Sequence, residues 1–250
     1  MKIYYSETAE QLGAKAAQKA AEYLNEAIAE KGSARLILST GASQFTTLSA
    51  LVNLDVDWSK VEMFHLDEYI GIDESHPASF VKYLKERFVS KVNLKSAHFV
   101  DLTDGAESII AKLTAELAEA VVDVGIIGIG ENGHIAFNDP PADFETQASY
   151  KVVNLDDKCR NQQLGEGWFP TFDDVPKQAI SMTVSQILKC RHIVSAVPYK
   201  VKAQAIHDTL TQEVNNMVPA TAFKTHADVN LFIDKESASM VDLDKFDVIK

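Results

Sequence analysis

The stretch Gly125–Pro141, which reads GIIGIGENGHIAFNDPP, decides the fold of this 250-residue chain. The run Val121–Ile129 is apolar and rich in β-branched side chains, which is typical of a strand buried on both faces of a parallel sheet. Gly128, Gly130 and Gly133 then permit tight or left-handed turns. In open α/β sheets, ligands bind beyond the carboxyl ends of the strands. We therefore expect a central buried strand that ends in a loop at a ligand site.

The polar residues of this loop are candidates for chemistry. Asn132, His134 and Asp139 all follow the predicted strand within a few residues of its end. A His flanked by Asn and Asp at this edge of a sheet is placed to act on a substrate. The alternative is a glycine turn that carries one surface His and a helix cap.

Composition limits the class of protein and its partners. The formal net charge is −12, so a nucleic-acid surface is not expected, because such a surface needs a basic stripe. A phosphorylated small molecule stays compatible, since a few cations and backbone amides suffice to bind it. Two cysteines, Cys159 and Cys190, fit a reducing compartment, and no apolar run has the length of a membrane span. We expect a cytoplasmic protein without a membrane partner.

The remaining chain alternates between apolar runs and helical periodicity, which predicts a mostly parallel sheet covered on both faces. The predicted strands are Arg35–Leu38, Val61–Leu66, Ala97–Val100, Tyr150–Leu155, Ala179–Met182, His192–Val197 and Val229–Ile233. The predicted helices are Ser6–Lys31, Phe45–Asn53, Pro77–Val89, Ala106–Ala120, Asp156–Gly167, Val184–Lys189, Lys200–Leu210 and Ala220–Thr225. No linker or repeat interrupts this order. We expect residues 1–250 to form a single doubly wound, Rossmann-like α/β domain.

Three other strand ends carry polar residues. The turn Ser39–Ser43, STGAS, lies between a strand and a helix, an arrangement that can bind an anion through backbone N–H groups and hydroxyls. Asp67 and Glu68 follow the next strand, where a carboxylate pair can move protons or can cap a helix. Lys200 follows the His192–Val197 strand and is either a cation for that anion or a solvated surface residue.

Three segments together resemble the glucosamine-6-phosphate deaminase (isomerase) family, which shares its fold with 6-phosphogluconolactonases. They are STGAS at Ser39–Ser43, HLDEYIG at His65–Gly71 and GIGENGHIAFNDP at Gly128–Pro140, in the order that the family has them. Softer matches are VPKQAISMTVSQIL at Val175–Leu188 and the helix at Lys200. The GHIAFN string favours the deaminase branch, because the lactonase branch is more similar to GHTASLFP there and has DERW in place of DEYI.

The resemblance implies conversion of an amino-sugar 6-phosphate to a ketose 6-phosphate with release of ammonia, without a metal or organic cofactor. His134 would move the proton that opens the sugar ring, oriented by Asp139 and Asn132. Asp67 would move a proton between C2 and C1, and burial would raise its pKa for this work. The residues expected to bind the substrate and its phosphate are Ser39, Thr40, Gly41, Ala42, Ser43, Gly133 and Lys200.

The sequence departs from the family pattern at three places. Asn132 stands where well-known members have Asp, and it cannot share negative charge with the imidazole. Asp139 is shorter than the Glu of many members. Gly165–Phe169, GEGWF, replaces a segment like NSRFF, so Gly167 or its neighbour occupies the place of a phosphate-binding arginine. Arg160, one helix earlier, is the candidate replacement.

Two other functions stay open from the sequence. A sugar-phosphate lactone hydrolase would need His134 and the phosphate contacts but not Asp67 as a base for a carbon acid. A sugar-phosphate-binding regulator without catalysis would fit Asn132 and the missing arginine. The exact amino sugar is open too, and the chain is expected to work as a monomer or a homo-oligomer.

Overall fold

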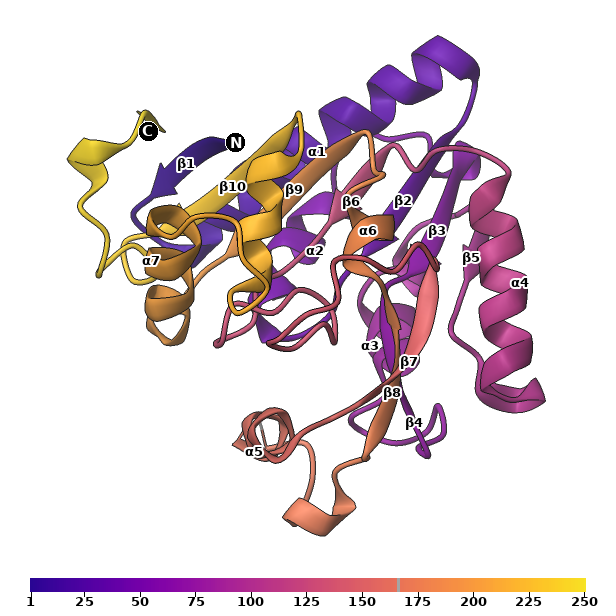
Figure 1. The fold of residues 1–250 in the computed structure, drawn as a ribbon. Coiled ribbons are helices and arrows are strands. Elements are labelled where there is room, and N and C mark those ends of the chain that lie inside the picture. Colours follow the sequence, from indigo (N-terminus) through magenta and orange to yellow (C-terminus); the bar gives the residue numbers. More distant parts are fainter. Residues whose placement is uncertain (166) are drawn as a thin grey trace.

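The protein is built around one eight-stranded sheet in which every pair of neighbouring strands is parallel (Figure 1). The computed structural model describes residues 1–165 and 167–250, and the strand order across the sheet is β11-β1-β10-β9-β6-β2-β3-β5. These strands are β1 (Lys2–Ser6), β2 (Ala34–Leu38), β3 (Val61–His65), β5 (Ser96–His98), β6 (Val124–Ile126), β9 (His192–Val197), β10 (Val229–Asp234) and β11 (Val248–Ile249). The predicted doubly wound α/β fold is confirmed.

Helices cover both faces of this sheet, which explains why the central strands β2 and β6 are buried along their whole length. In β2, Leu36 and Leu38 pack on one side of the sheet and Ile37 packs on the other. On the first side lie α1 (Ala9–Lys31), α2 (Phe45–Leu51) and α3 (Phe80–Arg87). On the second side lie α4 (Ala106–Ala118), α6 (Val184–Ile187) and α7 (Ala203–Thr211). None of the helices in the described part of the chain is long and apolar enough to cross a membrane.

A second, three-stranded antiparallel sheet stands beside the first and was not expected. Its order is β4-β8-β7, and its strands are β4 (Asp67–Ile70), β7 (Tyr150–Asn154) and β8 (Gln178–Met182). With α5 (Asp157–Gly165) and the short turn η5 (Phe172–Asp174) it forms what we call the small lobe, which extends from the lower side of the molecule in Figure 1. The sequence correctly predicts β7 and β8 as strands, but their place in the parallel sheet was wrong. Val152 in β7 is 41% exposed, so this sheet faces solvent on one side.

Two hydrogen bonds join the small lobe to the parallel sheet at the point where the chain crosses between them. The Tyr150 hydroxyl donates to the carbonyl oxygen of His65 at 2.6 Å. The backbone N–H of Met182 donates to the carbonyl oxygen of Leu66 at 2.9 Å. The end of β3 is therefore held directly against the small lobe, and β4 follows one residue later.

Helix starts differ from the sequence prediction where a nearby strand or hydroxyl competes. Ser6 is not the N-cap of α1, because it lies in β1; the side chain of Thr8 caps the helix instead, accepting from the Gln11 N–H at 3.3 Å. Pro77 does not begin α3, which starts after Ser79. Strand β1 was missed altogether. Gly32 ends α1 as predicted, at φ +80°.

The remaining described 3₁₀ turns lie between these elements. They are η1 (Ala42–Gln44), η2 (Trp58–Lys60), η3 (Val89–Lys91), η4 (Leu102–Asp104), η6 (Lys200–Lys202), η7 (Pro219–Thr225) and η8 (Leu243–Lys245). Four adjacent strands, in the order β9-β6-β2-β3, end at one edge of the sheet, and the chain order reverses between β2 and β6. Such a reversal opens a crevice at the carboxyl ends, which is where ligands bind in this class of fold.

Candidate active site

The first wall of the site is the turn Ser39–Ser43 after β2. The N–H of Ser39 donates to the carbonyl oxygen of Ile126 in β6 at 2.9 Å, and the N–H of Gly128 donates to Ser39 Oγ at 3.2 Å. Gly41 has φ +94°, a conformation that strains other residues. The turn is thus fixed between the ends of β2 and β6, with its hydroxyls at the crevice.

The second wall is the glycine loop after β6, which positions His134. The N–H of Gly130 donates to the carbonyl oxygen of His134 at 2.8 Å, and a Cβ on Gly130 would lie 2.2 Å from the imidazole ring. Only glycine therefore lets the ring lie against this backbone.

Asn132 and Asp139 support the imidazole from one side. Asn132 Oδ1 accepts the backbone N–H of His134 at 3.0 Å, while Asn132 Nδ2 donates to Asp139 Oδ1 at 2.9 Å. The same Asp139 oxygen lies 3.1 Å from His134 Nδ1, although the ring N–H is not aligned for a good hydrogen bond. Asn132 thus links the backbone of His134 to the carboxylate beside its ring.

The charge on Asp139 is strongly favoured. Burial alone would raise the pKa of Asp139, but the adjacent His134 ring, with hydrogen bonds from Asn132 and the Cys159 thiol, lowers it to about 2. Asp139 is thus ionised at physiological pH. A carboxylate next to Nδ1 orients the ring and favours a ring proton on that nitrogen.

The third wall carries Asp67, and the structure separates the roles of the Asp67–Glu68 pair. Successive side chains of a strand point to opposite faces. Asp67 lines the cavity and is only 6% exposed, and burial with the nearby Glu68 carboxylate raises its pKa to about 8. Glu68 instead accepts from Ser79 Oγ at 3.0 Å and from the Val81 N–H at 2.8 Å at the start of α3. Glu68 is a helix cap, whereas Asp67 faces the cavity from β4 rather than from a loop.

The three walls enclose a cavity of about 190 Å³. Of the residues expected from the sequence, it brings together Ser39, Thr40, Gly41, Ala42, Ser43, Asp67 and His134. Asn132, Gly133 and Asp139 do not line the cavity, and the first and last of these act on it through His134. Phe80 and Phe137 supply apolar wall.

Lys202, rather than the expected Lys200, is the lysine at the cavity. Among the described lining residues, Lys202 provides the single Lys or Arg side chain, while Lys200 is exposed and lies outside the lining. Both belong to η6, and in a 3₁₀ helix residues two apart point in different directions. The sequence predicted Lys200 at this strand end, and the structure places Lys202 of the same turn at the cavity instead.

Tyr199 is a cavity residue that the sequence analysis missed. It lies at φ +80° and ψ 148°, a region that is essentially restricted to glycine. The buried carboxylate of Asp234 accepts the Tyr199 N–H at 3.1 Å and the Ser237 N–H at 2.7 Å, which fixes this backbone. No sequence signal marks an aromatic residue in such a conformation.

Gln162 and Gln163 line the cavity from α5 and were also missed. On a predicted helix without an apolar stripe, a polar pair indicates a solvated face. Gln163 is nevertheless only 5% exposed, because α5 packs in the small lobe.

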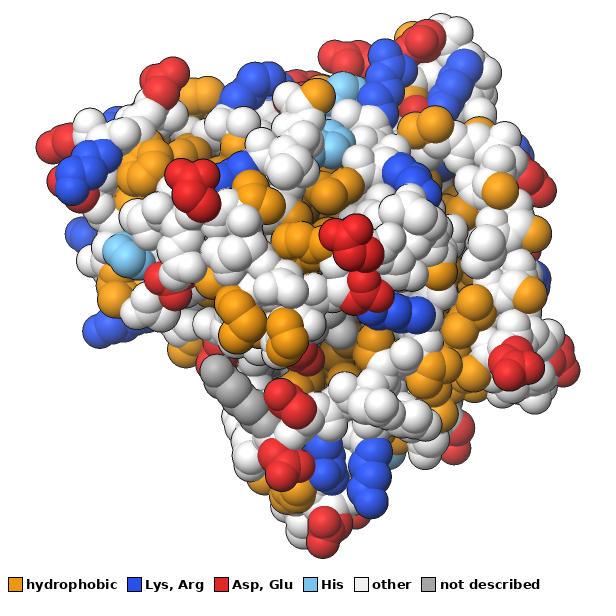
Figure 2. All heavy atoms as spheres, viewed as in Figure 1, with side chains coloured by type: hydrophobic (Ala, Val, Ile, Leu, Met, Phe, Trp, Pro, Cys, Tyr) orange, Lys and Arg blue, Asp and Glu red, His pale blue; other side chains and the backbone are white. Residues whose placement is uncertain are grey.

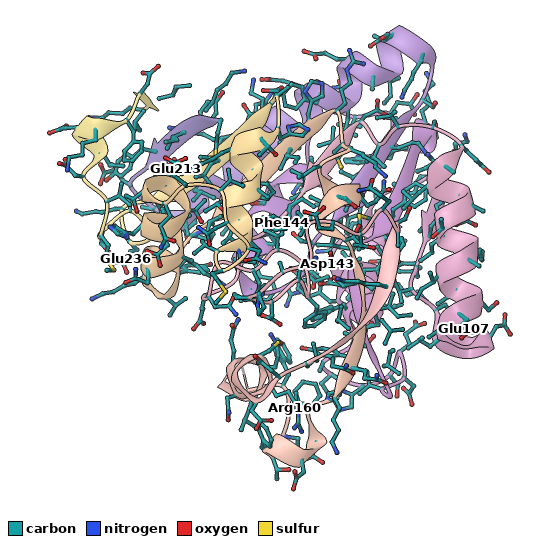
Figure 3. The ribbon with its side chains drawn as sticks, viewed as in Figure 1. Glu107, Asp143, Phe144, Arg160, Glu213 and Glu236 are labelled. Carbon is teal, nitrogen blue, oxygen red and sulfur yellow. The ribbon has the colours of Figure 1, made fainter. Side chains whose placement is uncertain are left out.

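Arg160 does not reach the cavity and therefore does not replace the missing arginine there. Its guanidinium donates to the carbonyl oxygens of Phe172 at 2.7 Å and Val175 at 3.0 Å, and it stacks on the Phe172 ring at 3.9 Å. Figure 3 shows Arg160 low in the small lobe, away from the parallel sheet. Gly167 has φ +83° and does not line the cavity, and its neighbour at position 166 lies outside the described residues.

The face of the molecule drawn in Figure 2 is mixed in charge. Acidic and basic side chains are interspersed on the face in Figure 2, with no continuous basic stripe. Within residues 1–165 and 167–250, no group of three or more His, Cys, Asp and Glu could hold a metal ion. The cavity combines one buried carboxyl group, one carboxylate-supported imidazole and one lysine beside a hydroxyl turn. This set can transfer protons on a small anionic ligand.

Fold and site together define a doubly wound α/β protein with a small-molecule site at the carboxyl edge of its sheet. The family model described as glucosamine-6-phosphate isomerases/6-phosphogluconolactonase matches residues 7–232. The chain belongs to this family.

Comparison with curated relatives and solved structures shows which members of the family are similar to this chain. The chain is 35% identical over 243 residues to glucosamine-6-phosphate deaminase of Thermoanaerobacter pseudethanolicus, covering 93% of this chain and 94% of the relative. It is 32% identical over 227 residues to glucosamine-6-phosphate deaminase of Oenococcus oeni, covering 90% and 94%.

A solved structure described as a monomeric glucosamine-6-phosphate deaminase superposes with a TM-score of 0.86 at 30% identity, covering 96% of this chain and 100% of that chain. A 6-phosphogluconolactonase from Thermotoga maritima reaches a TM-score of 0.77 at 16% identity, covering 94% and 99%, which shows the shared fold alone.

Proposed function

We propose that this protein converts glucosamine 6-phosphate and water to fructose 6-phosphate and ammonia. The observation that carries the proposal is Asp67, a buried carboxyl group with a pKa raised to about 8 that faces the same cavity as His134. A carboxylate that works on a carbon acid benefits from such a raised pKa, because its proton affinity then matches the operating pH. A lactone hydrolase has no step that uses this group. The names of the curated relatives support the same reaction.

The phosphate end of the substrate is assigned to the hydroxyl turn and Lys202. Backbone N–H groups and hydroxyls of Ser39–Ser43 suit phosphate oxygens, and Lys202 supplies the positive charge. Asp67 and His134 line the same small cavity, so a phosphate held at the turn positions the sugar carbons against them. Binding energy from the phosphate would then lower the barrier at C1 and C2.

The chemistry divides between the two proton-carrying groups. His134 moves a proton from the C1 hydroxyl to the ring oxygen, which opens the sugar to its aldehyde form. Asp139 stabilises the imidazolium formed during this transfer. Asp67, ionised, removes the proton from C2 and returns it to C1, while the C1 oxygen gains a proton and the amino nitrogen loses one. These transfers convert the amino aldehyde through an enolamine to a C2 imine that carries a C1 hydroxyl. Water then adds to C2 and gives one proton to the nitrogen; the C–N bond breaks as the second proton of that water moves from the new C2 hydroxyl to the nitrogen, so ammonia leaves and a C2 carbonyl remains.

The test is ammonia release from the purified protein given glucosamine 6-phosphate, with galactosamine 6-phosphate and 6-phosphogluconolactone assayed in parallel. We expect ammonia from glucosamine 6-phosphate and a loss of about 10²- to 10⁴-fold in kcat for Asp67→Asn, the usual contribution of a general base. Asp104→Asn, at an exposed position, is the matched control and should retain activity.

Other results of this assay would contradict the proposal. Lactone hydrolysis without ammonia would assign the chain to the lactonase branch. Ammonia from galactosamine 6-phosphate alone would change the sugar. No turnover of any of the three would favour a binding protein without catalysis.

We also propose that the protein acts in the cytoplasm and needs no partner subunit for its site. Its two cysteines support a reducing compartment, and a structural relative is described as monomeric. All the groups assigned to chemistry come from one chain. Sedimentation of the full chain, compared with its activity at increasing dilution, tests the assignment.

A further inference from the structure

The amide of Gln163 is a buried polar group of the cavity that neither phosphate binding nor proton transfer uses. Its side chain is 5% exposed and lines the cavity, and its Oε1 accepts a hydrogen bond from the Tyr69 hydroxyl. Within the described chain no acceptor receives a hydrogen bond from Nε2, and Nε2 is not among the fully enclosed atoms. The amide N–H₂ group therefore opens onto the cavity, where a ligand oxygen can accept from it. When a ligand fills the cavity and displaces water, this amide donor is costly to leave without a partner, so it favours a ligand with a suitably placed oxygen.

Gln163 is held on the same side of the cavity as the proposed base. Tyr69 lies two residues after Asp67 in β4, so the two side chains point to the same face of that strand. The Tyr69 ring packs against Phe80 at 5.0 Å and Phe137 at 5.1 Å between ring centroids, which fixes its hydroxyl. The Gln163 amide is thereby tied to the small lobe together with Asp67.

The phosphate groups come from the other side. The Ser39–Ser43 turn follows β2 and Lys202 follows β9, both strands of the parallel sheet. A sugar phosphate that spans from this turn to Asp67 places its phosphate on the sheet and its reacting carbons on the small lobe. The uncharged donor of Gln163 then meets the carbon chain, whose hydroxyl oxygens suit a neutral N–H.

We propose that Gln163 is a specificity-determining residue that donates a hydrogen bond to a hydroxyl of the sugar chain and not to the phosphate. This rests on the proposed function, because it assumes a sugar phosphate in the cavity. Tyr69 is its positioning residue. A site that presents a buried donor to a hydroxyl discriminates against ligands whose hydroxyl is absent or inverted, since the donor then stays unpaired.

The experiment compares the binding of two probes to the full chain by calorimetry. Glucitol 6-phosphate carries the hydroxyl chain and the phosphate but no amino group, so it cannot be deaminated; inorganic phosphate probes the anion site alone. The test variant is Gln163→Leu, and the matched control is Gln18→Leu, an exposed glutamine on α1. We expect Gln163→Leu to weaken glucitol 6-phosphate about ten- to hundredfold, as for loss of a buried hydrogen bond, with phosphate affinity changed less than about twofold.

A second variant, with a smaller change, distinguishes loss of the hydrogen bond from misfolding of Gln163→Leu. Tyr69→Phe leaves the amide in place but removes the hydroxyl that orients it, and it should weaken glucitol 6-phosphate about three- to tenfold with phosphate affinity retained. For turnover, the ratio of kcat/KM between glucosamine 6-phosphate and its C4 epimer galactosamine 6-phosphate should move towards one in Gln163→Leu.

Equal weakening of both probes, or of neither, would overturn the assignment of Gln163 to the sugar chain. The proposed function fails separately: wild-type protein that releases no ammonia but loses glucitol 6-phosphate selectively in Gln163→Leu refutes the deamination and retains this inference. Wild-type protein that binds no glucitol 6-phosphate overturns both.

Discussion

The stability of Asp67→Asn relative to the wild type should grow as the pH rises, while the substitution slows the proposed chemistry. Asp67 has a folded-state pKa of about 8 against an ordinary value of 3.8, because it is buried beside Glu68. In the described chain no group donates a hydrogen bond to its oxygens. Between these two pH values the folded protein holds a proton that the unfolded chain has released. The stability that the protonated carboxyl allows is fully present below pH 3.8 and is lost as the pH rises through 8.

The size of the effect follows from the shift. A difference of about 4 pKa units, at about 1.4 kcal/mol each, corresponds to about 6 kcal/mol of lost stability above pH 8 and to about 4 kcal/mol at pH 7. Asn has nearly the same shape and does not titrate. The free energy of unfolding of Asp67→Asn minus that of the wild type should therefore grow by about 1.4 kcal/mol per pH unit between pH 4 and pH 8, and then level off.

Urea unfolding of both proteins at pH 4.5, 6, 7 and 8.5 measures this slope. Any constant cost of the buried Asn amide shifts all points equally and leaves the slope unchanged. Asp104→Asn should run parallel to the wild type. In the same pH series, wild-type kcat/KM should rise towards a plateau with an apparent pKa of about 8, because the base must be ionised in the free protein. Parallel stability curves for Asp67→Asn and wild type would refute the raised pKa and with it the main support for the proposed base.

Three further changes test the walls of the site. Gly130→Ala places a Cβ 2.2 Å from the ring of His134, so the ring must move, and kcat should fall about 10²-fold with little change in the affinity for inorganic phosphate; normal turnover would show that the ring position is not critical. Lys202→Met should raise KM for the sugar phosphate about 10- to 100-fold by loss of a charged hydrogen bond, whereas Lys200→Met should change it less than about twofold. The reverse order would make Lys200 the phosphate-binding lysine. Tyr199→Gly relieves the strain at φ +80° and should raise the free energy of unfolding by about 1 kcal/mol, which is the strain energy minus the cost of the greater freedom of glycine in the unfolded chain. Tyr199→Ala keeps the strain, so its thermal unfolding should show no gain in stability.

The parts of the site that the sequence predicts are those set by local backbone rules. A strand buried on both faces gives an apolar run, and the glycines after it mark the turn that presents His134. The expectation that burial raises the pKa of Asp67 agrees with its place in the structure, where this carboxyl group is buried beside Glu68.

The parts that it does not predict depend on partners far away in the chain. Strand β4 pairs with β8, more than a hundred residues later, and this pairing sends Asp67 to the cavity and Glu68 to α3. Arg160 finds carbonyl oxygens of η5 that no spacing rule reveals. The difference between Lys200 and Lys202 is a matter of rotation within one 3₁₀ turn, which depends on the strained conformation of Tyr199 before it.

The connection between β3 and β4 sets the distance from the phosphate-binding end of the site to the proposed base. The hydrogen bonds from Tyr150 and Met182 fix the small lobe against the end of β3. They therefore also fix the distance between the Ser39–Ser43 turn and Asp67. A ligand anchored by its phosphate presents to Asp67 whichever carbon lies at that span, so chain length decides which C–H bond is offered. A five-carbon sugar phosphate could bind as tightly as a six-carbon one and would still present C1, instead of C2, to the base.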